Sequence, residues 1–141
     1  MPRQVVLSLP WSPSVNTYWR SIMSGPLAGR VLISERGRAY RKAVADAVIS
    51  QRVPVGVLSG KLAVEIHALP PDRRARDLDN LLKGLLDSLH HAGVIRDDSE
   101  IDDLRIRRFG IRPGGELQIR ITEIPGAATE SGELFREVAR A

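Results

Sequence analysis

The chain has 141 residues, a usual length for one domain. Its hydrophobic content of 43% is enough for a core, and this core must be mainly aliphatic because only 4% of the residues are aromatic. The chain has no cysteine, which excludes disulfides, cysteine-ligated zinc and thiol catalysis. It has no apolar run near the ~20 residues that span a bilayer and no signal-peptide pattern, so we expect a soluble, cytoplasmic protein without membrane contact.

The formal net charge is +4, and 18 of the 21 basic residues are arginine. Arginine makes planar, two-pronged contacts with phosphate, so this composition suggests a polyanionic partner. A GC-rich genome also raises arginine usage, and the charge by itself leaves both explanations open.

The first half of the chain predicts a strand, a loose hairpin and a long helix. Residues 4–9 are typical of a strand that a proline ends. Residues 17–22 and 30–33 can pair across a Ser-Gly-Pro loop. Ser34 is a good N-cap for a helix over residues 35–51, whose apolar positions recur on one face.

The second half predicts a strand, a helix and two further strands. Residues 61–69 alternate between apolar and polar, as a half-buried strand does. Leucines recur at helical spacing over residues 78–89, and Gly93 ends that helix. Residues 103–111 and 116–124 are typical of strands joined by an Arg-Pro-Gly-Gly turn.

These elements predict an α/β fold of the α+β type, in which a small mixed β-sheet is covered by two main helices. We expect a single domain over residues 1–125. Residues 126–141 are weakly patterned and predict a C-terminal tail that is frayed or forms a short helix.

The most informative segment is residues 72–83, where three arginines lead into Asp77 and Asp79 at the start of the leucine-rich helix. One aspartate there can simply cap the helix, and a second competes for the same backbone donors. If Asp77 lies just before the helix and Asp79 in its first turn, both carboxylates can converge on a hard cation such as Mg²⁺. Spacing alone leaves capping and metal binding open.

Lys83 follows Asp79 by four residues, on the same face of the predicted helix. The two side chains can form an ordinary surface ion pair, and Asp87 continues that face in support of such a ladder. Beside a bound phosphate, the ammonium group of Lys83 could instead stabilise the charge that develops on the phosphoryl oxygens.

A second group of acids follows the leucine-rich helix, and Asp97, Asp98, Asp102 and Asp103 compete as candidate ligands. The helix is about four turns long, so this loop should lie at the opposite end from Asp77. To meet the first acids, the loop must fold back or a second subunit must complete the site.

Arginines accompany both groups of acids. Arg73, Arg74 and Arg76 could hold a phosphate backbone that the acids alone would repel, although solvated loop arginines are common. Arg105 and Arg107 alternate on a predicted strand, so one surface of the sheet should be basic.

Residues 71–83 (Pro-Asp-Arg-Arg-Ala-Arg-Asp-Leu-Asp-Asn-Leu-Leu-Lys) and 91–98 (His-Ala-Gly-Val-Ile-Arg-Asp-Asp) closely resemble the RusA family of Holliday-junction resolvases. The opening over residues 9–19 and the ending over residues 115–123 are similar to that family too. The resemblance spans about residues 4–124, but neither the loop over residues 21–29 nor the tail matches a motif.

The resemblance implies a homodimeric, Mg²⁺- or Mn²⁺-dependent endodeoxyribonuclease with a mixed α/β fold. Such an enzyme makes paired nicks in opposing strands of a four-way junction during recombination and repair, and a phage or prophage origin is implied as well. The resemblance assigns metal binding and catalysis to Asp77, Asp79 and Asp98 and catalysis to Lys83. Contacts with DNA are expected from Arg73, Arg74, Arg76, Asn80, Arg105 and Arg107. The resemblance also implies aromatic residues on the motif helix, where this chain instead has Leu85 and Leu86.

Two alternatives remain. The protein could be a non-catalytic module that binds branched DNA and whose acids only cap the helix. It could also be a nuclease that acts on flaps or replication forks.

Overall fold

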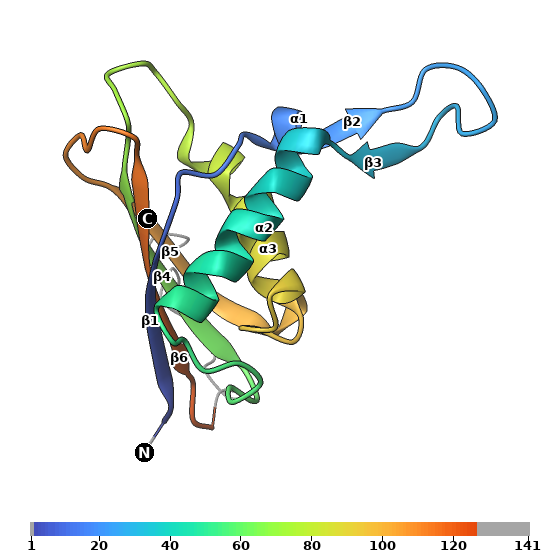
Figure 1. Cartoon of the computed structure of the whole chain (residues 1–141). Helices are drawn as coiled ribbons and strands as arrows, with labels where there is room; N and C mark the ends of the chain where they lie inside the picture. The colour runs from blue at the N-terminus through green and yellow to red at the C-terminus, as the bar shows by residue number, and fades with distance from the viewer. Residues whose placement is uncertain (1, 127–141) are drawn as a thin grey trace, which may run out of the picture.

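The computed structural model of the chain describes residues 2–126 (Figure 1). Its elements follow the order β1 (Gln4–Leu9), α1 (Val15–Tyr18), β2 (Trp19–Ser21), β3 (Val31–Ile33), α2 (Glu35–Ser50), β4 (Leu62–Leu69), the 3₁₀ turn η1 (Leu78–Leu81), α3 (Leu82–His91), the 3₁₀ turn η2 (Asp98–Glu100), β5 (Ile101–Arg108) and β6 (Glu116–Glu123).

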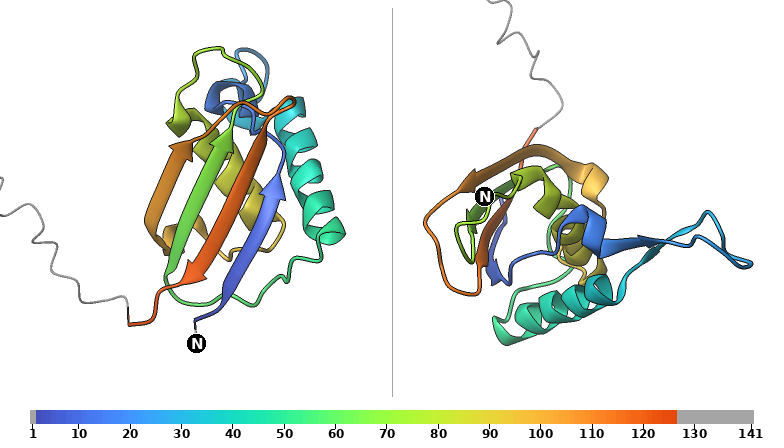
Figure 2. Two further views of the ribbon diagram at one scale, coloured as in Figure 1. Left: turned by 90° about the vertical axis from the view of Figure 1, so that its left-hand side faces the viewer. Right: turned by 90° about the horizontal axis from the view of Figure 1, so that it is seen from above.

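A four-stranded mixed sheet in the order β1-β6-β4-β5 forms one layer. β4 and β5 are parallel, whereas β6 runs antiparallel to both β1 and β4. α2 and α3 cover one face of this sheet, and no described element covers the other, which we call the open face (Figures 1 and 2). The small mixed sheet with two main helices is therefore confirmed.

The two central strands provide much of the core. Their side chains alternate as the sequence predicts, with every second residue pointing toward the helices. The inward residues, each at most 1% exposed, are Leu62, Val64, Ile66, Ala68, Leu117, Ile119 and Ile121.

Both long helices begin or end as their terminal residues predict. The Ser34 hydroxyl accepts a hydrogen bond from the Gly37 N–H at 3.0 Å and so caps α2. Gly93 has a left-handed φ of +80°, and the Val94 N–H donates to the Leu89 carbonyl at 3.0 Å just beyond α3. This is the bond that closes a Schellman motif.

The predicted hairpin is confirmed, but it is shorter at its first strand than expected. β2 and β3 pair antiparallel over three residue pairs. Thr17 and Tyr18, which were expected in the strand, belong to α1 because both of their N–H groups donate to the Ser14 carbonyl.

The predicted Arg-Pro-Gly-Gly turn before the last strand is confirmed, since the Gly115 N–H donates to the Arg112 carbonyl at 2.7 Å, but the two strands that it helps to join are not neighbours in the sheet. β5 and β6 do not pair, because β4 lies between them and pairs with both. The link from β5 follows the end of β4, where the Phe109 N–H donates to the Ala68 carbonyl and the Arg112 N–H to the Pro70 carbonyl. The link from β5 to β6 therefore passes over the end of β4.

Within residues 2–126, no helix is long and apolar enough to cross a membrane. The tail expected over residues 126–141 lies outside the described residues except for Gly126.

Candidate active site

The segment rich in arginine and aspartate follows β4 and crosses the end of the sheet. Asp77 is the residue before η1 and has an extended backbone with φ −86° and ψ 131°, while Asp79 lies within η1. Both side chains are exposed, and the Asp77 carboxylate makes no capping hydrogen bond in the described chain. The two residues thus have the backbone positions that the sequence analysis expected, and the side chain of Asp77 does not cap the turn by a hydrogen bond.

Lys83 is exposed on α3 and forms no ion pair with any described residue. The expected ladder from Asp79 through Lys83 to Asp87 is not formed, because Asp87 bonds elsewhere. Its Oδ2 lies 2.6 Å from Arg41 Nη2 on α2 and accepts a hydrogen bond from the Tyr18 hydroxyl. Lys83 therefore has no ion-pair partner within the described chain, although its charge helps to lower the pKa of Asp87.

The contact among Tyr18, Arg41 and Asp87 ties three helices together beneath the site. Tyr18 is fully buried, and Arg41 Nε donates to its hydroxyl at 2.9 Å. Burial by itself would raise the pKa of Asp87, but the hydrogen bonds from Tyr18 and Arg41 outweigh it and hold that pKa below its usual range. The helix that carries Lys83 is thus fixed to α1 and α2.

Asp72 organises the loop that precedes Asp77. Its Oδ1 accepts from the Arg74 N–H at 2.9 Å and from Arg76 Nη1 at 2.7 Å. The Arg76 guanidinium, which also lies 5.8 Å from the centre of the Trp11 ring, is the main cause that lowers the pKa of Asp72 to about 2. Asp72 was missed as a positioning residue, although the i,i+4 spacing to Arg76 could have indicated it.

The three loop arginines therefore differ in their surroundings. Arg76 is held in the fold by Asp72 and Trp11, and only 24% of its side chain is exposed. Arg73 and Arg74 are exposed, and the side chain of Arg74 is 84% exposed. Asn80, the remaining predicted DNA contact of this segment, lies half-buried in η1.

Asp98 lies at the other end of the sheet. α3 runs away from η1, and the loop after α3 leads through η2 into the start of β5. Asp77 lies near the opposite end of β5, because the carbonyl of its neighbour Arg76 accepts a hydrogen bond from Arg108. The loop therefore does not fold back within one chain. Accordingly, no three acidic or histidine side chains of the described residues are close enough to share a metal ion.

The four candidate acids after α3 are separated by their local partners. Asp97 accepts a hydrogen bond from the Ser99 N–H at 3.1 Å, which is the main cause that lowers the pKa of Asp97. Asp102 lies 3.8 Å from Lys61, and Asp103 lies 3.2 Å from Arg105. Asp98 is exposed and forms no ion pair with a described residue.

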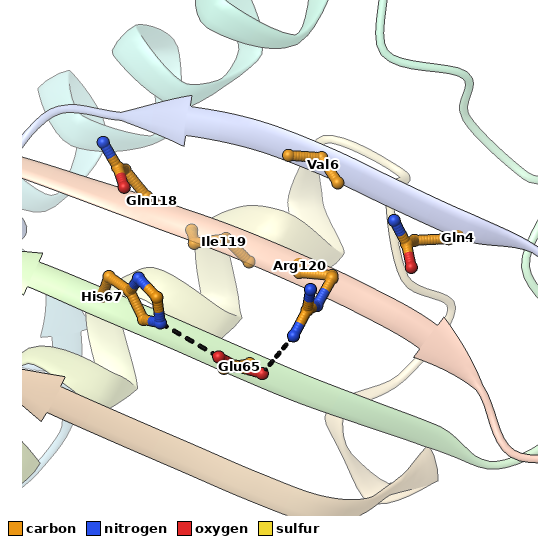
Figure 3. A pocket seen from close by; sticks show the side chains of 7 residues that line it. All are labelled: Gln4, Val6, Glu65, His67, Gln118, Ile119 and Arg120. Atoms are coloured by element: carbon orange, nitrogen blue, oxygen red, sulfur yellow. Dashed lines mark hydrogen bonds and ion pairs between the residues drawn. The ribbon is translucent and has the colours of Figure 1, made fainter.

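Arg105 and Arg107 point to the same face, as predicted, and this is the open face of the sheet. A shallow pocket lies there between Gln4, Val6, Glu65, His67, Gln118, Ile119 and Arg120 (Figure 3). Glu65 binds Arg120 at 2.6 Å and His67 at 3.0 Å, and Arg107 lies 5.1 Å from the centre of the Phe109 ring. None of the predicted metal ligands lines this pocket.

Comparison with known proteins places the chain in a class of DNA-cleaving enzymes. A family model described as "Endodeoxyribonuclease RusA" matches residues 10–122. The chain is 46% identical over 116 residues to "Crossover junction endodeoxyribonuclease rusA" of Enterobacteria phage HK97, which covers 82% of this chain and 92% of that protein. Over 119 residues it is 40% identical to the protein of the same name in Enterobacteria phage 82, with coverage of 84% and 93%.

A bacterial protein named "Crossover junction endodeoxyribonuclease RusA", from Escherichia coli strain K12, is 39% identical over 119 residues, with coverage of 84% and 93%. The chain belongs to the RusA family. The matched residues include the whole predicted site, from the acids before α3 to the strand that carries Arg105 and Arg107.

Proposed function

We propose that this protein is a metal-dependent endodeoxyribonuclease that resolves four-way DNA junctions by paired nicks in opposing strands. One observation carries the proposal: in a chain whose relatives are named crossover junction endodeoxyribonucleases, Asp77 and Asp79 lie exposed at the start of α3 without ion-pair partners in the described chain. Free carboxylates this close in sequence repel each other, and a divalent cation relieves that repulsion.

Asp77, Asp79 and Asp98 are the residues that would hold Mg²⁺, for which Mn²⁺ can substitute. When bound, such an ion supplies Lewis-acid polarisation of the scissile phosphate and a source of hydroxide near neutral pH. Carboxylate oxygens are the ligands that Mg²⁺ prefers, and the exposed setting leaves room for its remaining waters.

Lys83 stabilises the negative charge that develops on the phosphate oxygens, because its ammonium group lies one helical turn from Asp79 and has no described ion-pair partner. Arg73 and Arg74 contact the phosphates of the flanking strand, with Asn80 and Arg76 beside them. Arg105 and Arg107 contact a second stretch of the DNA from the open face. These contacts weaken as salt rises, because they replace counterions on the DNA.

A second subunit supplies the missing acid. β5 is an edge strand, so one side of its backbone has no partner in the sheet. Antiparallel pairing of β5 with its copy across a twofold axis at Leu104, which is 41% exposed, places the two Leu104 side chains together. The same register sets Asp103 opposite Arg105 of the partner subunit, so the surface is complementary to itself.

This pairing also brings the two groups of acids together. Antiparallel strands place the start of one β5 beside the end of the other, and Asp77 lies near the end of β5 through the bond from Arg108 to the Arg76 carbonyl. Asp98 of the partner subunit then approaches Asp77 and Asp79. The homodimer would therefore contain two such sites related by the twofold axis, which suits cutting of two opposing strands.

The test is to incubate the protein with a labelled mobile four-way junction and Mg²⁺, beside Asp79→Asn and Lys83→Met. Wild type is expected to make paired, symmetric nicks. Asp79→Asn should bind the junction without cutting it, and Lys83→Met should cut about 10²–10³-fold more slowly. Asp46→Asn, an exposed acid that pairs with Lys42 on α2, is the matched control and should cut like wild type.

Other outcomes identify the alternatives. If wild type and Asp79→Asn both bind without cutting in Mg²⁺ and in Mn²⁺, the protein is a binding module. If three-way junctions or flaps are cut faster than four-way junctions, it is a nuclease for other branched DNA.

A further inference from the structure

Residues 19–33, which we call the arm, form a hairpin that projects from the body of the molecule (Figure 1). Beyond the three residue pairs of β2 and β3, the Ile22 N–H donates to the Arg30 carbonyl at 2.9 Å and the Gly29 N–H to the Ile22 carbonyl at 2.8 Å. Gly25 has a left-handed φ of +85° at the turn. The arm is therefore a hydrogen-bonded hairpin out to its tip.

The arm exposes large apolar side chains that no described element covers. Met23 is 88% exposed, Val31 60% and Leu27 42%. A two-stranded hairpin has marginal stability in water, and several large apolar side chains exposed on it indicate a surface that binds something.

The charge of the arm fits a polyanion. Its only charged side chains are Arg20 and Arg30, and residues 2–34 contain no aspartate or glutamate at all. Both arginines are exposed, and neither forms an ion pair within the described part of the chain. A protein surface with exposed arginines and no acid attracts phosphate, whereas it cannot form ion pairs with the basic side chains of a protein partner.

The base of the arm is fixed next to the candidate site. α1, which leads directly into β2, contacts η1 and α3. The Tyr18 carbonyl accepts from the Ser34 N–H at 2.9 Å where the arm ends, and the Tyr18 hydroxyl bonds to Asp87 on α3. The arm therefore leaves the body at the end where Asp77 and Asp79 lie (Figures 1 and 2).

We propose that the arm is a wedge that enters the branch point of the DNA. Met23 and Leu27 pack against bases that are unstacked at the crossover, and Arg20 and Arg30 contact the adjacent phosphates. Apolar side chains that separate stacked bases are known in proteins that bend DNA. The proposal rests on the proposed function, because the acids must bind a phosphate of the same junction.

The wedge also explains a preference for branched DNA. In a continuous duplex the insertion must break a base stack, whereas the stack is already interrupted at a branch point, so the insertion costs less there. The arm thus makes the free energy of binding depend on the shape of the DNA, without reading its sequence.

The test combines Met23→Ser with Leu27→Ser and measures 2-aminopurine fluorescence at the crossover of a four-way junction, in EDTA so that no strand is cut. Wild type should raise the fluorescence as bases unstack, and the double variant should lose that rise. In Mg²⁺ the variant should cut an intact junction at least about tenfold more slowly. It should regain the wild-type rate on a junction with mismatched bases at the crossover, which is already open.

Ile49→Ser is the matched control, because Ile49 on α2 is 75% exposed and lies outside the arm. It should open and cut the junction like wild type. The proposal is overturned if the double variant still unstacks the crossover, if mismatches do not restore its cutting, or if it changes the mass of the protein in sedimentation, which would make the arm a subunit contact. A wild type that cuts no branched DNA would refute the proposed function instead.

Discussion

Carboxylates near the candidate site differ in what their oxygens contact. Asp72, Asp87 and Asp97 each accept hydrogen bonds from an arginine or a backbone N–H, and each has a pKa held below its usual range. Asp77 and Asp79 accept no such bond within residues 2–126. The first group holds the fold in place, so the second group is the one left for a ligand.

Asp87 should make stability depend on pH. Its pKa is lowered in the folded protein, so its contribution is present above the unfolded value of about 3.9 and is lost as the pH falls through the folded value. Asp87→Asn should lower the free energy of unfolding at pH 7 by about 1.5–3 kcal/mol, because the charged hydrogen bonds to Arg41 and Tyr18 are lost. Below pH 4 the difference from wild type should shrink.

Urea unfolding of Asp87→Asn at pH 7 and pH 3 measures this effect. Asp46→Asn is the control, since its partner Lys42 is 79% exposed and such surface pairs contribute little. Equal losses of stability in the two variants would show that the buried contact with Tyr18 has no special weight.

Among the secondary-structure elements, those with a strong local pattern could be predicted and those set by tertiary contacts could not. The alternation in β4 and the cap at Ser34 fix a strand and a helix start locally, and both predictions were confirmed. The Arg-Pro-Gly-Gly turn gave no information on which strand lies next to β5, because that choice depends on the apolar face of β4, whose buried side chains need a neighbouring strand on each side.

The candidate site shows the same division. Residue types and spacing predict a site at Asp77, Asp79 and Lys83, and these residues lie just before η1, within η1 and in the first turn of α3. The sequence could not decide whether the loop with Asp98 turns back, because that depends on the straight course of α3 and on where β5 begins. The sequence also does not indicate that the Arg76 guanidinium contacts the ring of Trp11, which is 65 positions earlier in the chain.

The packing of α3 against the loop after β1 depends on Gly84. A Cβ atom there would lie 2.7 Å from Ser12 Oγ and 3.0 Å from Tyr18 Cδ2. Gly→Ala in a helix normally stabilises by up to about 1 kcal/mol, but this close approach should reverse the sign. We expect Gly84→Ala to lower the free energy of unfolding by about 1–3 kcal/mol, as overpacking of a core does.

Thermal and urea unfolding would check the effect of Gly84→Ala. A Cβ atom at Gly110 would meet nothing within 4 Å, so Gly110→Ala is the control and should stay within about 0.5 kcal/mol of wild type. A stabilised Gly84→Ala protein would mean that the loop moves away from α3 without cost.

For the whole molecule, the proposed subunit contact is tested by exchanging charges on β5. Asp103→Arg would face Arg105 of the partner subunit and should weaken dimerisation by at least about tenfold, because like charges at an interface cost several kcal/mol. Adding Arg105→Asp restores opposite charges in every pair of that register. Sedimentation equilibrium should therefore show a dimer for wild type and for the double variant, and mostly monomer for Asp103→Arg.

Cutting of the junction should be lost together with the dimer in Asp103→Arg, since each site needs Asp98 of the partner subunit. For the double variant the mass is the readout, because Arg105 is also an expected DNA contact. Arg120→Asp changes a charge on the same open face but on a central strand, so it should leave the mass unchanged. Identical masses for all variants would exclude the contact through β5.

The strand order also bears on how the protein folds as it is synthesised. β6, the last strand to leave the ribosome, fits between β1 and β4, which leave it first and second among the strands of this sheet. Until residues 116–123 emerge, the nascent chain holds two strands with unpaired inner edges and no bridge between them. Closure of the sheet must therefore wait for nearly the whole described chain, which makes folding slow and largely post-translational.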